Sequence, residues 1–566
     1  MKHTKLVLAM AATLTATASF SALAMDLYVD SKTKQVFTEP GKGRVLLNDS
    51  NNVKVGNTPF VPTPVAAPAA DIEAIKKDLE LKTNEIKALS EKAEEAADPK
   101  FAHVKLDDGI HFATKDGNFT ASINGRLQVD SQTNVNQALN NGGYTQATNA
   151  TALGNDGLGT HIANGAPLTL SDGMALRRGR LGVEGTFFKN TFYKFEYDFT
   201  RAGTSSNFGN TASSGVTDAF IGYNFTKESL IKVGAFKEPF SLEEATSNRY
   251  TTFIERNMAV NTFVDNLNTY KLGIGGNYST DRWLAATSLQ TESVGNTSST
   301  TSAVAGDTSN RKAGTGNTSW EANARVAGTP WMASKTKFLH VGASGSYMQI
   351  NNNYNADGTF SNGGMIFANG IGNNVDRTTI LSTGNMTSGS KNALNAHSVD
   401  HMTRFGAESA VVYGPFSAQT EYLRTDLSGE GYSSTALDGY YGYVTYFLTG
   451  ESRNYKAKTA SWDRIKPNRN FDLKGGWGAW ELATGYDYLN LNSGPVQGGR
   501  ASTAKFGINW YLNSHTRFMA NYVKALDINT AGATTSNATT SGLYSTNRGY
   551  NNADFDIIET RVQLDW

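Results

Sequence analysis

The chain has 566 residues, of which 51 are Lys or Arg and 51 are Asp or Glu, so its formal net charge is zero. This balance provides no global attraction for nucleic acid, and any preference for ions must come from the local placement of charges. The absence of cysteine excludes disulfides and thiol chemistry, and the mean hydropathy of −0.40 indicates a polar chain.

Residues 1–24 have the pattern of a secretory signal peptide. Lys2 and Lys5 precede an apolar stretch that is too short to span a membrane, and a small-x-small cleavage site ends at Ala24. Residues 25–70 follow as a leader whose end is rich in proline, which predicts a semi-rigid periplasmic spacer. No later segment reaches the length of a transmembrane helix, so a membrane role would have to come from strands.

Residues 71–98 predict a helix with a heptad repeat. Asp71 is a suitable N-cap, and Ile72, Leu79 and Ile86 recur at one heptad position. Because an isolated helix of this length is marginally stable, we interpret the segment as a short periplasmic coiled coil that joins subunits. Isoleucine and leucine at the seam are compatible with a trimer. A single amphipathic helix packed on another part of the protein is the alternative.

Residues 101–566 predict an all-β domain in which one face of each strand is apolar and the other is polar. In the last segment, Ile558, Val562 and Leu564 alternate with Glu559 and Arg561. Side chains on a strand point to opposite faces with a period of two, so such a strand has one apolar and one polar face. Repeated along the chain, this pattern is typical of an outer-membrane β-barrel.

The connections between these strands alternate between long polar ones and short ones, as in barrels with long external loops and short periplasmic turns. We therefore expect a transmembrane antiparallel β-barrel of about 16 strands, with both chain ends in the periplasm. The connection 448–475 breaks the rule, since it should be short. Connections near 349–400 and 493–502 are expected to be long polar loops. A soluble β-sandwich or a surface lectin is the alternative fold.

The third long connection, 237–268, is expected to fold into the barrel and narrow it. Ser241 and Glu244 have the spacing of a capping box, which predicts a short helix. Arg249 and Arg256 lie downstream and would line the opening. The alternative is an ordinary surface loop that closes over the barrel.

On the barrel wall, the alternation places several cations toward the lumen. Arginine stays protonated and its planar group matches tetrahedral oxyanions, while cations on low-dielectric walls raise the local concentration of anions. The predicted wall cations are Arg178, Arg180, Lys232 and Arg404, and Arg177 joins them only if a bulge intervenes. The alternative is that carboxylates balance these charges and make a nearly unselective pore; the candidates are Glu184, Glu196, Asp198 and Glu408.

Signals for an enzyme are weak. His397 and His401 lie four residues apart without a third metal ligand, and no phosphate-binding glycine loop, zinc-protease signature or nucleophile elbow is present. We therefore expect no catalytic residue, metal or cofactor. The alternative from another functional class is a surface adhesin or a barrel enzyme.

Several segments together resemble the phosphate- and polyphosphate-selective porins of the porin O/P family. They are LRRGRLGVEGTFFKNTFYKFEYDF (176–199), IKVGAFKEPFSLEEATSNRYTTFIERN (231–257), GPFSAQTEYLR (414–424), YFLTGESRNYK (446–456), RIKPNR (464–469), WGAWEL (477–482) and GINWYLN (507–513).

The resemblance implies a homotrimer of sixteen-stranded barrels in the outer membrane of a Gram-negative bacterium, with lipid around it and a third loop folded inward. It also implies that Arg177 and Arg178 act as paired central arginines, Lys232 as a lumenal lysine and Arg256 as part of the constricting loop. The expected function is passive, anion-preferring diffusion of small solutes, chiefly phosphate or polyphosphate. A non-selective or organic-acid diffusion porin of the same fold is the alternative.

Overall fold

The computed structural model describes residues 28–30, 36–37, 44–46, 69–96, 103–105, 109–138, 169–200, 205–206, 209–212, 215–265, 270–293, 319–350, 352–354, 358, 360–362, 365–376, 378–384, 386, 397–432, 435–530 and 550–566. It divides into two units, Met1–Ala96 and Ala97–Trp566. The predicted signal peptide and most of the predicted leader lie outside the described residues.

The first unit contains a small antiparallel sheet and one long helix. In the sheet, β1 (Tyr28–Asp30) pairs with β2 (Val36–Phe37) on one side and β3 (Arg44–Leu46) on the other. The helix α2 (Ala69–Ala96) covers the predicted heptad segment, and its Leu79 and Ile86 are 67% and 66% exposed in the single chain. The helix is thus present with an apolar seam that nothing in the described chain covers, while its pairing with other subunits remains a prediction.

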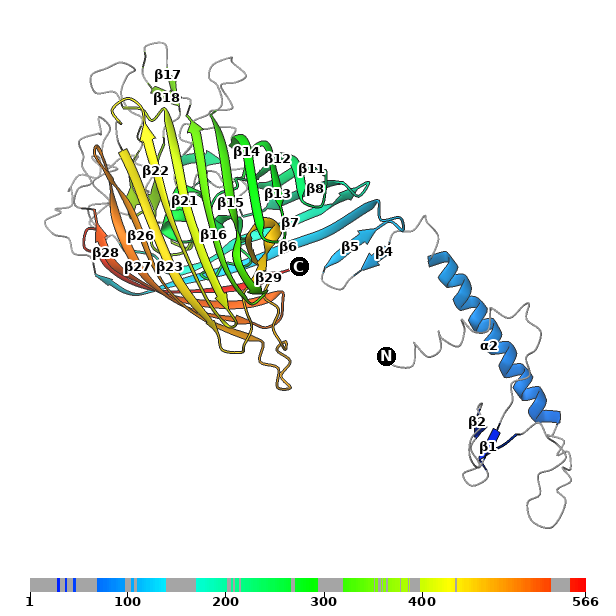
Figure 1. Cartoon of the computed structure of the whole chain (residues 1–566). Helices are drawn as coiled ribbons and strands as arrows, with labels where there is room; N and C mark the ends of the chain where they lie inside the picture. The colour runs from blue at the N-terminus through cyan, green and yellow to red at the C-terminus, as the bar shows by residue number, and fades with distance from the viewer. Residues whose placement is uncertain are drawn as a thin grey trace. The chain divides into compact units, whose positions relative to one another are not determined.

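The second unit is a closed antiparallel barrel of sixteen strands (Figure 1). The strands are β6 (Phe119–Ala138), β7 (Gly173–Phe187), β8 (Thr191–Asp198), β11 (Val216–Asn224), β12 (Ser229–Lys237), β13 (Tyr270–Ser279), β14 (Trp283–Ser293), β15 (Trp320–Ser334), β16 (Lys337–Gln349), β21 (His401–Tyr413), β22 (Phe416–Ser428), β23 (Thr435–Phe447), β26 (Ala479–Ser493), β27 (Val496–Tyr511), β28 (Thr516–Asn529) and β29 (Asp554–Asp565).

The barrel closes where β29 pairs with β6. Gln563 lies opposite Gln128, and Trp566 exchanges backbone hydrogen bonds with Gly125. A short hairpin of β4 (His103–Lys105) and β5 (Ile110–Ala113) extends the first part of β6. Closure leaves no unpaired edge in the barrel wall, which is the condition for strands to cross a membrane.

Burial follows the predicted alternation. On β29, Ile558, Val562 and Leu564 are 43–45% exposed, whereas Glu559 and Arg561 are buried. The apolar face is therefore the outer surface and the charged face lines the interior, which is the reverse of a water-soluble protein and suits a wall in contact with lipid. Among the described residues, no helix is long and apolar enough to cross a membrane.

The connections largely follow the expected alternation of long and short. The connection between β23 and β26 is long where the rule requires a short one, as the sequence indicates. A second departure is the connection predicted at 493–502, where β26 and β27 continue as a hairpin with only residues 494–495 between them. Gln497, Gly498 and Gly499 have the composition of a loop, but they lie within β27. Leu491 and Val496 next to the turn are buried, and this packing outweighs the weak strand preference of the glycines.

Candidate functional site

The connection between β12 and β13 is bound along the polar inner face of the barrel. It contains two short helices, α3 (Leu242–Ala245) and α4 (Met258–Phe263). Ser241 caps α3, since its Oγ accepts a hydrogen bond from the backbone N of Glu244 at 3.2 Å. The helix predicted from these two residues is therefore present, whereas α4 has no such signal in the sequence.

Charged side chains of the wall hold this segment at both helices and between them. Glu421 on β22 accepts hydrogen bonds from backbone N–H groups at the start of α3, at 3.0 and 2.8 Å. Asp487 on β26 accepts one from the start of α4, at 2.7 Å. Arg517 on β28 and Arg561 on β29 donate to backbone carbonyls that lie between the helices, at 2.8 and 2.6 Å. The segment is thus attached to at least four wall strands.

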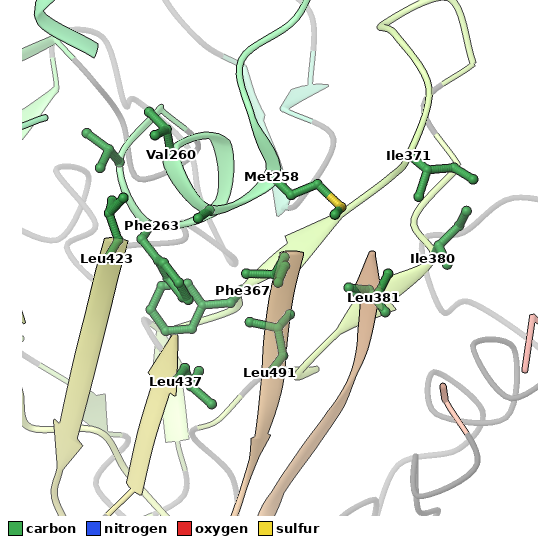
Figure 2. Packing of buried hydrophobic residues seen from close by; sticks show 14 of the residues in the cluster. Met258, Val260, Phe263, Phe367, Ile371, Ile380, Leu381, Leu423, Leu437 and Leu491 are labelled. Atoms are coloured by element: carbon green, nitrogen blue, oxygen red, sulfur yellow. The ribbon is translucent and has the colours of Figure 1, made fainter. Parts of the chain in front are cut away.

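An apolar core fills part of the interior next to α4 (Figure 2). Phe263 of α4 meets Phe367 edge to face with ring centroids 5.4 Å apart, and both are buried. Leu423 on β22 and Leu491 on β26 belong to the same cluster. Phe367 lies in the connection expected to be a polar loop at 349–400, and the described part of that connection instead contributes apolar side chains to the core.

The long connection 448–478 also folds against the interior. It carries β24 (Asn454–Lys456), the 3-10 turn η5 (Ala457–Thr459) and β25 (Ser461–Asp463). Arg325 on β15 donates to the carbonyl of Ala460 at 2.8 Å, and Trp462 Nε1 donates to Gln419 on β22 at 2.5 Å. Trp462 also donates through its backbone N to Thr246, just after α3. The extra length of this connection therefore contributes residues around Ala460 and Trp462 to the barrel interior.

Arg177 and Arg178 both lie on the inner side of the barrel. On β6, Gln128 pairs with Arg178 and the next residue, Val129, pairs with Leu176, so β7 has a β-bulge at Arg177. The bulge lets Arg177 point inward, although strict alternation along the strand would direct it outward. Arg177 binds Glu255 through two hydrogen bonds, at 2.7 and 3.1 Å. Arg178 Nη1 donates to the neutral side chain of Gln128 at 2.9 Å and forms no ion pair within the described part of the chain.

Four of the other predicted site residues are neutralised by neighbouring carboxylates. The pairs are Arg180 with Asp198 (2.7 Å) and Glu196 (2.9 Å), Arg249 with Glu196 (4.0 Å), Arg256 with Glu244 (2.8 Å) and Asp265 (3.1 Å), and Arg404 with Glu238 (2.8 Å). Arg180 and Arg404 lie on strands, whereas Arg249 and Arg256 lie on the inward segment. Lys232 contacts aromatic rings instead.

Two acids of the inward segment have opposite electrostatic environments. Burial opposes ionisation of Glu255, but the charge of Arg177 outweighs it and holds the pKa of Glu255 well below its ordinary value. Burial and the nearby charge of Glu421 raise the pKa of Glu243 to about 8. Glu255 therefore carries a charge that neutralises the arginines beside it, whereas Glu243 is mostly protonated at neutral pH.

Further arginines on the inner face of the wall strands were not selected from the sequence, among them Arg126, Arg325, Arg517 and Arg561. Arg561 pairs with Asp130 at 2.7 Å, and Arg325 pairs with Glu408 at 2.6 Å. The alternation along each strand would have identified their inward direction. Their partners lie on strands distant in sequence, so the pairing itself required the barrel register.

The interior of a closed, lipid-facing barrel, narrowed by inward segments and lined by charged side chains, defines an outer-membrane channel of the porin class. A family model described as "Phosphate-selective porin O and P" matches residues 169–566. The chain belongs to this family of porins, which places it in the outer membrane of a Gram-negative bacterium.

Among curated proteins, the chain is 29% identical over 442 residues to Porin O of Pseudomonas aeruginosa, covering 75% of this chain and 86% of that protein. It is 25% identical over 356 residues to an uncharacterized protein of Caulobacter vibrioides, covering 62% of this chain and 63% of that one. Among solved structures, it is similar to OmpT of Vibrio cholerae (13% identity, TM-score 0.41, 82% of this chain and 100% of that one) and to an anion-selective porin from Comamonas acidovorans (10% identity, TM-score 0.40, 79% and 100%).

Proposed function

We propose that the chain is a passive, anion-preferring pore for small solutes, and that phosphate or polyphosphate is its principal solute. The observation that carries this proposal is the bulge that turns two consecutive arginines inward, one of which binds only a neutral partner among the described side chains. Arg177 is partly exposed, so an oxyanion can exchange with the carboxylate bound to it. Weak, competitive binding of this kind lets an ion enter and leave. No catalytic step is part of the proposed role.

A general diffusion pore is the second candidate, and the carboxylates favour it. Most described wall arginines lie within an ion pair, including Arg180, Arg325, Arg404 and Arg561. Paired charges produce a transverse field across the lumen with little net attraction for anions. The two candidates differ in whether the Arg177–Arg178 pair dominates the permeation path.

The deciding experiment measures reversal potentials and phosphate block in planar bilayers. The variant Arg177→Gln/Arg178→Gln should lose anion preference and weaken phosphate block without closing the pore. Arg424→Gln is the matched control, because Arg424 is about half exposed on β22 and pairs with Asp426 at 2.7 Å away from the constriction. An unchanged reversal potential in the double variant removes these arginines from the path and leaves the general pore.

We further propose that the barrel functions as a homotrimer with both chain ends in the periplasm. The support is α2, whose apolar seam includes Leu79, Ile86 and Leu89, all more than 60% exposed in the single chain. Burying such a seam in a coiled coil removes it from water.

A further inference from the structure

Three phenylalanines and one lysine share the inner face of neighbouring strands β8, β11 and β12. We call Phe192, Phe220, Phe236 and Lys232 the phenylalanine–lysine patch. The residues with the opposite alternation point outward, since Ile221 is 64% and Val233 is 56% exposed to the lipid side. The patch is therefore part of the lumen wall, on strands that contribute nothing to the apolar core around α4.

The rings lie along the wall above glycines. A Cβ atom at Gly222 would lie 2.2 Å from Cζ of Phe192, and one at Gly275 would lie 2.9 Å from Cζ of Phe236. Any larger residue at these two positions would displace the rings. Phe220 links the other two edge to face, with centroids 6.1 Å from Phe192 and 6.4 Å from Phe236. The glycines thus allow a continuous aromatic surface, and Phe192 and Phe220 remain partly exposed.

Lys232 supplies a positive charge at this surface. Its Nζ lies 4.2 Å from the ring centroid of Phe236 and 5.1 Å from that of Phe220. The neighbouring Lys194 is paired with Asp218 at 3.0 Å, whereas Lys232 makes no ion pair with any residue that the structure describes. The charge of Lys232 is therefore held by ring faces, which bind a cation without neutralising it.

This arrangement has no use for inorganic phosphate. A phosphate ion makes no favourable contact with a phenyl ring. Exposing the rings to water in the lumen is unfavourable, so the patch gains free energy only when an apolar group covers it. A ligand that carries both an aromatic ring and an anionic group would use the two partly exposed rings and the lysine. Its ring would contact Phe192 and Phe220, and its anionic group would reach Lys232.

We propose that the phenylalanine–lysine patch is a binding subsite for aromatic carboxylates, which widens the solute range of the pore from inorganic to organic anions. The proposal rests on the proposed pore function. Each ring-to-ring contact contributes enough for roughly a 2- to 10-fold change in affinity, which is the range expected of weak, releasable sites.

The test compares block of KCl conductance by benzoate and by acetate in planar bilayers with the full chain. The two anions carry the same charge and differ in the ring, so the wild-type pore should bind benzoate more tightly. Phe192→Leu/Phe220→Leu should reduce benzoate affinity by roughly 4- to 100-fold and leave acetate and phosphate unchanged. Lys232→Gln should weaken both carboxylates. Phe405→Leu, at a lipid-facing phenylalanine that is 53% exposed, is the matched control.

Equal block of the wild-type pore by benzoate and acetate overturns the proposal without any variant, so a folding defect cannot mask the result. A benzoate preference that persists in both the double leucine variant and Lys232→Gln also overturns it. Absence of KCl conductance in the wild type would instead overturn the proposed pore function. A conducting, phosphate-blocked pore without benzoate preference would overturn only the aromatic subsite.

Discussion

Replacing Glu255 by glutamine should strengthen phosphate binding, because this acid neutralises two arginines at once. Its carboxylate lies 2.7 Å from Arg177 and 3.1 Å from Arg561. An anion in contact with either guanidinium comes within about 5 Å of that carboxylate, where two unit charges repel by roughly 3 kcal/mol at an effective dielectric constant of 20. Screening in 0.1 M salt, with a Debye length of about 10 Å, reduces this to roughly 2 kcal/mol.

A change of roughly 2 kcal/mol corresponds to about a 30-fold lower Kd for phosphate in the Glu255→Gln variant. The assay is the concentration dependence of phosphate block of single-channel KCl conductance. Asp426→Asn is the matched control, since it removes a carboxylate that pairs with Arg424 outside the constriction. Equal KCl conductance of the Glu255→Gln variant and the wild type in the absence of phosphate would show that the inward segment has kept its position. An unchanged or weaker phosphate block at normal conductance would refute the reasoning.

Three further predictions concern packing, pH and assembly. Phe263→Ala should weaken the attachment of α4 by about 3–5 kcal/mol, because it removes a buried ring. Channel conductance and proteolysis of the inward segment should both increase, whereas the control Phe405→Ala, at a lipid-facing position, should change neither. Unchanged conductance and unchanged proteolysis in Phe263→Ala would contradict this prediction. Because the pKa of Glu243 is raised from 4.5 to about 8, the stability that its protonated form contributes is complete below about pH 4.5 and is lost as pH rises through 8. Open-channel noise should therefore rise above pH 8 and lose this dependence in Glu243→Gln, and an identical pH profile in the variant would count against it. Deletion of residues 71–98 should lower the temperature at which the oligomer dissociates on gels while preserving conductance, and an unaltered dissociation temperature would exclude the coiled coil from assembly.

The barrel could be predicted from the sequence because strand alternation is a local signal. The contrast between Arg180 and Leu181, or between Arg561 and Val562, requires only that neighbouring side chains point to opposite faces. The same signal gave the inward direction of the wall cations. Because Arg177 and Arg178 are consecutive, the sequence could place both in the lumen only with a β-bulge, and the register of β6 with β7 contains that bulge.

The filling of the lumen could not be predicted in this way. α4 and the apolar residues around Phe367 lie in segments without a period of two, and their packing depends on strands far away in sequence. Likewise, Trp462 in the 448–478 connection donates hydrogen bonds to Gln419 and Thr246, which lie far away in sequence. Glu196 and Asp198 were named from the sequence as balancing carboxylates, but Glu238 and Glu255 were not, because finding an ion pair requires the placement of strands and connections that are distant in sequence.

The pairing of β29 with β6 has a consequence for biogenesis. On one side of the first long strand, β6, the partner is β29, which forms the final twelve residues of the barrel wall, so the sheet can close only after the whole domain has been synthesised. A product that lacks β29 would present two open strand edges, which invite aggregation.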